Sequence, residues 1–143
     1  MSKAYFGYGA NLDPMGMRTR CPGATLGGRA ILQDHRFFIT VDGYSSVRPE
    51  AGRQVHGLLW SLPALDEPAL DQFEGVPEGL YRKEHRLVIQ ESGDQVAAMI
   101  YMARAVQVGR ARPGYLEGIL AAASSLGFPS EYLDELRRSQ LPS

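Results

Sequence analysis

The order of the strand-like segments constrains the fold of this chain more than any other feature. Apolar, β-prone runs follow one another up to residue 103 without regular long crossovers, and the longer helical patterns come after them. Parallel strands need a crossover of a dozen or more residues, usually a helix. The order therefore indicates an α+β fold built on a largely antiparallel sheet or barrel.

Short sequence signals predict where the elements begin and end. Asp13 before Pro14 is typical of a helix start, because Asp caps the first N–H groups and Pro suits the first turn. Segment 43–52 is expected to be mostly loop. Strands are predicted at 4–8, 29–41 (as one strand or two), 55–60, 81–90 and 96–103, and helices at 14–20, 67–73, 115–126 and 130–136.

Size and charge exclude several kinds of partner. With 143 residues we expect a single domain over 1–143. A formal net charge of −1 and scattered arginines provide no basic face for nucleic acid. No stretch approaches the ~18 apolar residues of a membrane span, and the first residues lack the apolar core of a signal peptide. We therefore expect a cytoplasmic protein that binds neither nucleic acid nor membrane.

The cysteine and the histidines do not form a metal-binding pattern. Cys21 is the only cysteine, and the three histidines are well separated: His35, His56 and His85. None of this matches the ligand spacing of a metal centre. Cys21 lies in a turn, and we expect a structural thiol, since a nucleophilic thiolate needs a base and a low pKa.

A glycine-rich segment near the N-terminus is the first candidate site. It follows a strand and precedes the helix expected at 14–20, and it reads Phe6-Gly7-Tyr8-Gly9-Ala10-Asn11-Leu12. Consecutive backbone N–H groups exposed by glycines can hold an anion. The alternative is a plain turn that closes the strand. A nucleotide P-loop is excluded, because no Lys-Ser/Thr follows the glycines.

A carboxylate at the end of the helix expected at 67–73 is the second candidate. Glu74 stands between Phe73 and Val76, and apolar neighbours would raise its pKa and suit it to proton transfer. The alternative is a solvated acid in a surface turn. Other acids lie close by, and spacing alone does not choose among them: Glu67, Asp71 and Glu78.

Two tyrosines are the third candidate. Tyr81 and Tyr115 each follow a glycine-containing turn, and either could close a pocket. Each could equally be a core tyrosine with its hydroxyl hydrogen-bonded.

Together these segments resemble the γ-glutamyl cyclotransferase family over nearly the whole chain. Residues 6–12 are similar to the family's opening Tyr-Gly-Ser-Asn-Leu motif, and 43–47 followed by 55–60 resemble its middle strands. Residues 70–76 align with the segment that carries the family's catalytic Glu, and Gly79-Leu80-Tyr81 follows it as it does there. Residues 113–116 and 126–132 resemble the closing helices.

The resemblance implies a small mixed, largely antiparallel β-barrel flanked by short helices. It implies release of 5-oxoproline from a γ-glutamyl peptide or amine, with Glu74 as general acid/base and no metal or cofactor. It assigns Tyr115, and less directly Tyr81, to the substrate pocket. A homodimer is left open. The loop that would bind the small-molecule γ-glutamyl substrate, chiefly through its α-carboxylate, is Gly7, Tyr8, Gly9, Ala10, Asn11 and Leu12.

One position departs from the family pattern. The family usually has Ser where this chain has Ala10, so a hydroxyl contact is lost while the backbone N–H remains. Two other functions stay open: a catalytically silent binding module, and a cyclotransferase that removes a γ-glutamyl blocking group in one dedicated pathway. The sequence does not identify the leaving amine.

Overall fold

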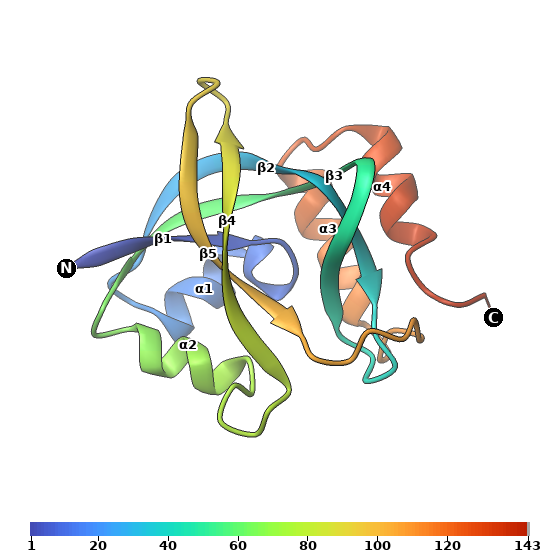
Figure 1. Cartoon of the computed structure of the whole chain (residues 1–143), viewed down its shortest axis with the longest axis horizontal. Helices are drawn as coiled ribbons and strands as arrows, with labels where there is room; N and C mark the ends of the chain where they lie inside the picture. The colour runs from blue at the N-terminus through green and yellow to red at the C-terminus, as the bar shows by residue number, and fades with distance from the viewer. Residues whose placement is uncertain (143) are drawn as a thin grey trace.

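A computed structural model of the chain describes residues 1–142. Its elements follow one another as shown in Figure 1. The strands are β1 (Ser2–Gly7), β2 (Thr25–Ile39), β3 (Ser45–Pro63), β4 (Tyr81–Gln90) and β5 (Gln95–Ala103). The helices are the 3-10 turn η1 (Ala10–Leu12), α1 (Pro14–Arg20), α2 (Glu67–Phe73), α3 (Tyr115–Ser125) and α4 (Ser130–Arg137).

The five strands form a closed barrel in the order β1-β3-β2-β4-β5. Four of the strand pairs are antiparallel, and the pairing of β1 with β5, at Tyr5 and Met99, is parallel. Closure removes the free sheet edges that would otherwise expose unpaired backbone groups. The expected mixed, largely antiparallel barrel with short flanking helices is confirmed.

The loop expected at 43–52 is wrong over most of its length. β3 begins at Ser45 and runs for 19 residues, and its first half pairs with the second half of β2. The pair Phe37 and Val47 is buried, whereas Gly52 and Arg53 lie toward solvent. The segment looks like a loop in sequence because it is rich in glycine, serine and proline, while the pairing that makes it a strand is with residues of β2.

The predicted helices agree with the structure to within one residue at each end. The Asp13 side chain accepts the N–H of Met15, so it caps α1 as expected. The helix at 67–73 is confirmed, but Asp66 does not cap it with its side chain. The Asp66 carboxylate instead accepts the N–H of Gly23, which ties the start of α2 to the loop after α1.

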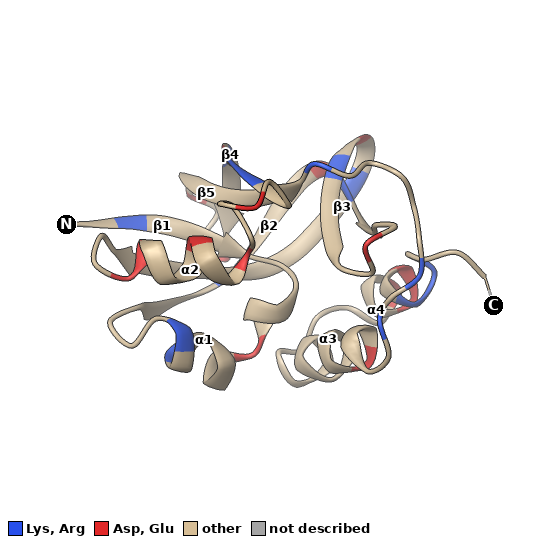
Figure 2. Ribbon diagram, turned by 90° about the horizontal axis from the view of Figure 1, so that it is seen from below, with Lys and Arg blue, Asp and Glu red and all other residues tan. Residues whose placement is uncertain are grey.

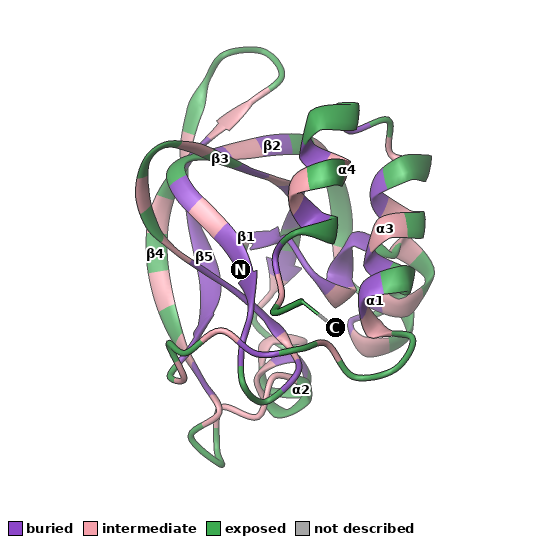
Figure 3. Cartoon of the chain, turned by 90° about the vertical axis from the view of Figure 1, so that its right-hand side faces the viewer, coloured by how far each residue is buried: buried purple, intermediate pink, exposed green. Residues whose placement is uncertain are grey.

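Most of the buried residues lie along the strands of the barrel. Figure 3 shows the buried residues along the strands and the inner faces of the helices, with exposed residues on the outer turns of α3 and α4. His56 of β3 stacks against Phe128 and Tyr132, with ring centroids 5.4 and 4.6 Å apart, and this joins the barrel to the α3–α4 pair. In Figure 2 the charged residues are spread over several elements. Within residues 1–142, no helix has the length and apolar character needed to span a bilayer.

Candidate active site

A pocket of about 190 Å³ lies where β1, the β2–β3 turn and the C-terminal end of α2 meet. Its walls are mainly aromatic, and they bring together several of the residues singled out in the sequence. The lining residues are Tyr5, Tyr8, Gly9, Ala10, Tyr44, Ser45, Phe73, Glu74, Leu80, Tyr81, Tyr101 and Tyr115.

Glu74 is placed in the pocket by the way α2 ends. It is the C-terminal cap of the helix, and its N–H donates to the Leu70 carbonyl at 3.0 Å. Gly75 then takes a left-handed conformation (φ +70°), which reverses the chain. The Leu80 N–H donates to the Gly75 carbonyl at 3.0 Å, so the chain returns at once to the pocket wall.

A network of charges holds α2 against the barrel. Lys83 of β4 bonds both Glu67 and Asp71, each at 2.8 Å, and Lys3 of β1 pairs with Glu67 at 2.9 Å. The hydroxyl of Tyr101, a pocket residue, donates to Asp71 at 2.6 Å. Asp71 and Glu67 therefore hold α2 in place through these bonds, and the position of α2 in turn fixes the direction of Glu74.

The carboxyl of Glu74 has the electrostatics of a proton-transfer group. Burial raises its pKa from 4.5 to about 7, and the nearby Arg20 acts in the opposite direction. The residue keeps some accessible surface because it faces the pocket. Glu78, the remaining acid considered in the sequence, is exposed. Among the described residues that line the pocket, Glu74 is the only carboxylate.

The glycine loop forms the opposite wall. Gly9 and Ala10 line the pocket, and their backbone N–H groups bond no acceptor within residues 1–142. A Cβ at Gly9 would collide with the Ser45 Oγ and lie 3.4 Å from the Tyr115 hydroxyl. The φ of Gly9 is −120°, so close approach, and not a positive φ, is what requires glycine here.

The loop residues predicted from the sequence divide into two groups. Tyr8, Gly9 and Ala10 line the pocket, as do Tyr81 and Tyr115 from elsewhere in the chain. The other three loop residues lie behind the wall: Gly7, Asn11 and Leu12. Of these, Leu12 is fully buried in the core and Asn11 is 2% exposed.

Three of the pocket tyrosines are anchored by the backbone. Tyr8 donates to the Tyr101 carbonyl at 2.6 Å, and Tyr81 donates to the Ser45 carbonyl. Tyr115 accepts the Ser45 N–H at 3.1 Å and shares a second bond with the Ser45 Oγ at 2.8 Å. Burial raises the pKa of all three, so each is a neutral phenol at physiological pH.

Several lining residues are not among those that the sequence pattern singled out, chiefly Tyr5, Tyr44, Ser45 and Tyr101. Tyr5 lies on the strand that leads directly into the glycine segment, and that position could have identified it. Ser45 has no such signal, because the segment that contains it looks like a loop in sequence.

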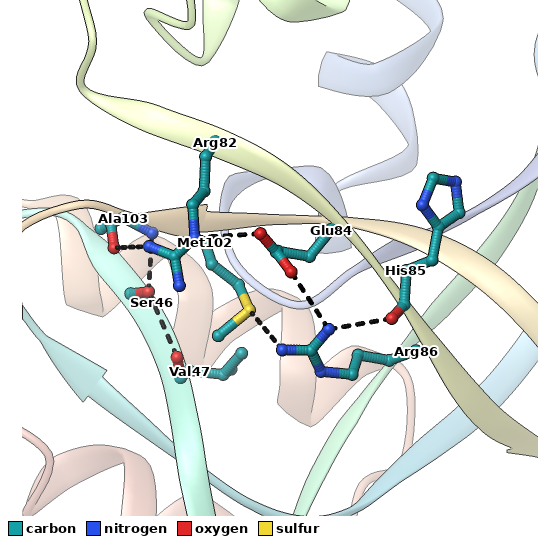
Figure 4. Close-up of polar contacts among 8 residues, drawn as sticks. All are labelled: Ser46, Val47, Arg82, Glu84, His85, Arg86, Met102 and Ala103. Atoms are coloured by element: carbon teal, nitrogen blue, oxygen red, sulfur yellow. Dashed lines mark hydrogen bonds and ion pairs between the residues drawn. The ribbon is translucent and has the colours of Figure 1, made fainter.

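Two other features lie outside the pocket chemistry. Burial raises the pKa of the Cys21 thiol to about 11, which keeps it protonated and supports a structural thiol. A polar cluster on β4 pairs Glu84 with Arg82 at 3.1 Å and with Arg86 at 3.3 Å, so one carboxylate is shared by two arginines (Figure 4). Within the part of the chain that the structure describes, no group of His, Cys, Asp and Glu residues could hold a metal ion.

In the same region, Ser46 links β3 to β5 by a hydrogen bond. Its Oγ accepts the N–H of Ala103 at 2.9 Å, and Arg82 donates to the Ala103 carbonyl at 3.3 Å (Figure 4). Ser45 directly precedes Ser46, so this hydrogen bond fixes the end of the β2–β3 turn beside the pocket.

Comparison with known proteins places this chain in a family. Residues 54–136, more than half of the chain, match the AIG2-like family. The chain belongs to the AIG2-like family. Gamma-glutamylcyclotransferase of Homo sapiens is 26% identical over 93% of this chain and 76% of its own length, and that of Mus musculus is 28% identical over the same shares.

A solved structure titled gamma-glutamyl cyclotransferase superposes with a TM-score of 0.84. It is 23% identical and covers 100% of this chain and 90% of its own. At that identity the match shows the fold. The comparisons confirm the resemblance stated from the sequence, the cyclotransferase-type barrel and the expectation of an enzyme.

Proposed function

We propose that this AIG2-like protein is a γ-glutamyl cyclotransferase that releases 5-oxoproline from a γ-glutamyl peptide or amine. The observation that carries the proposal is the position of Glu74. It is the pocket's carboxylate, its pKa is raised to about 7, and it faces a wall that contains unpaired backbone N–H groups. The named relatives support the same activity.

The glycine loop would hold the head group. The unpaired N–H groups of Gly9 and Ala10 suit the α-carboxylate of the substrate, and the Ser45–Tyr115 pair lies beside Gly9 to add a hydroxyl. The aromatic wall then keeps the γ-glutamyl chain curled, with its α-amine near its own γ-carbonyl. Such intramolecular proximity supplies much of the rate, because nucleophile and electrophile are held together.

Glu74 would move the protons. The α-amine starts as an ammonium and loses a proton to the carboxylate, and its nitrogen bonds to the γ-carbon. The bond from that carbon to the leaving nitrogen then breaks as Glu74 returns the proton to it, and the ring nitrogen gives its second proton to the regenerated Glu74 carboxylate, which passes it to solvent. The products are 5-oxoproline and the free amine. A pKa near 7 lets one group serve as base and then as acid.

The test is incubation of the purified protein with a panel of γ-glutamyl peptides and γ-glutamyl amines, with detection of 5-oxoproline. Turnover of at least one compound is expected, and its N-acetyl form should give no product because the nucleophile is blocked. Product formation from the N-acetyl compound would exclude the intramolecular mechanism. No turnover across the panel would favour a catalytically silent binding module.

A further inference from the structure

A chain of hydrogen bonds runs from the protein surface to the pocket through residues that the mechanism above does not use. The Arg20 Nη1 donates to the Asn11 Oδ1 at 2.6 Å, and the Asn11 Nδ2 donates to the Tyr5 hydroxyl oxygen at 2.9 Å. Asn11 and Tyr5 are 2% and 3% exposed, so the bond between them is buried, whereas the Arg20–Asn11 bond is part-buried.

Arg20 fixes the direction of the whole chain. A guanidinium has only donors, so the Asn11 amide must turn its oxygen toward Arg20 and its NH₂ toward Tyr5. Tyr5 must then use its oxygen as an acceptor. Its own hydrogen remains available, and no acceptor for it is present within the described residues 1–142.

The other pocket hydroxyls differ in this respect. Tyr8, Tyr81 and Tyr101 have each donated their hydrogen to a protein oxygen. The Ser45–Tyr115 pair keeps one hydrogen, but it lies beside Gly9, at the head-group end. Tyr44 is only half-buried at the wall. Tyr5 is thus a buried donor with a fixed orientation and no protein acceptor.

Tyr5 also shares the pocket with Glu74. The Glu74 charge adds to burial in raising the pKa of Tyr5, which keeps the phenol protonated. Its ring is held edge-on against Tyr101, with centroids 5.6 Å apart. A donor held rigidly before the reaction needs no reorganisation when charge develops.

We propose that the Tyr5 hydroxyl donates a hydrogen bond to the substrate's γ-carbonyl oxygen, with Asn11 and Arg20 as positioning residues that aim and polarise it. The proposal rests on the cyclotransferase function proposed above. As the α-amine nitrogen bonds to the γ-carbon, the carbonyl oxygen becomes negative and the bond from Tyr5 strengthens. Tyr5 keeps its proton throughout, while Glu74 carries the proton from the attacking to the leaving nitrogen.

The first experiment removes only the hydroxyl. Tyr5→Phe keeps the ring packing, and loss of one oxyanion donor typically lowers kcat about 10²–10³-fold. KM should change by no more than about threefold, because the head group is held at the other end of the pocket. Tyr132→Phe is the matched control: that tyrosine is also buried, packs against His56 outside the pocket, and should keep wild-type kcat.

The second experiment reverses the direction of the chain. In Asn11→Asp the new carboxylate still pairs with Arg20, but it accepts the Tyr5 hydrogen and withdraws it from the pocket. The loss in kcat should match that of Tyr5→Phe, and the double variant should be no slower than Tyr5→Phe alone. Independent contributions would instead multiply.

The outcomes separate the two proposals. Near wild-type kcat in folded Tyr5→Phe, with Glu74→Gln inactive, would overturn this inference and leave the proposed function standing. Multiplicative losses in the double variant would overturn the coupling through Asn11. If Asn11→Asp does not fold, the Tyr5→Phe result decides the role of Tyr5. If wild-type protein releases no 5-oxoproline from any γ-glutamyl compound, the function fails and this inference fails with it.

Discussion

Replacing Glu74 by Gln tests the proposed proton transfer most directly. The amide keeps the shape of the side chain and its place at the end of α2, and it removes the basicity. Acid–base help is typically worth about 10²–10⁴-fold, so kcat should fall by that much. KM should change little, because the glycine loop and the Ser45–Tyr115 pair would hold the head group.

The same substitution should change stability in a way that depends on pH. A pKa of about 7 in the folded state, against 4.5 for the free side chain, corresponds to about 3 kcal/mol at ~1.4 kcal/mol per tenfold change. Because the folded-state pKa is raised, the contribution of Glu74 to wild-type stability is greatest below pH 4.5 and is lost as pH rises through about 7. Gln lacks this ionisation, so the variant should gain up to about 3 kcal/mol relative to wild type between about pH 4 and pH 8.

Two measurements and one control test these effects of Glu74→Gln on rate and stability. Initial rates of 5-oxoproline release give kcat and KM, and urea unfolding at both pH values gives the free energies of unfolding. Glu78→Gln is the matched control, since Glu78 is exposed, and it should alter neither. A near wild-type rate in Glu74→Gln would refute the mechanism. A stability difference that does not change with pH would refute the raised pKa.

Three further predictions concern the pocket walls. Gly9→Ala should reduce kcat/KM at least about tenfold while the protein still folds, because the new methyl collides with Ser45 beside the head-group site; wild-type kinetics would show that the loop is not this site. Ala10→Ser should fold normally and tighten substrate binding by up to about 1 kcal/mol, measured as Kd for an unreactive analogue, and weaker binding would contradict this. Arg20→Gln removes the cation that lowers the pKa of Glu74, so the acidic limb of the kcat/KM profile should shift to higher pH than in wild type. An acidic limb at the same or a lower pH would contradict the assignment.

Local signals were sufficient for much of the secondary structure. Asp13 before Pro14 marks the start of α1, and α2 begins at Glu67 just ahead of Pro68, as expected from the first-turn preference of proline. These signals act between residues a few positions apart, so the sequence alone contains them. The absence of long crossovers likewise favoured an antiparallel arrangement, which the barrel confirms.

Pairing between distant residues could not be obtained in this way. The first half of β3 is a strand because Val47 and its neighbours meet Phe37 and its neighbours on β2. Nothing within 43–52 alone carries that information. Distant contacts also decide which acid is available in the pocket. Asp71 is hydrogen-bonded to Tyr101, which is 30 residues away, and to Lys83.

By itself, the sequence determined the order of the elements, the glycine loop and the acid at the end of α2, because each depends on local backbone preference or on a motif of adjacent residues. Only the tertiary structure decided which groups face the pocket and in what state. Burial raises the pKa of Glu74, and the hydrogen bond from Arg20 orients Asn11 so that it donates to Tyr5 in the pocket wall. The first effect depends on desolvation and the second on hydrogen bonds between separate elements, and both exist only once the barrel has closed around these residues.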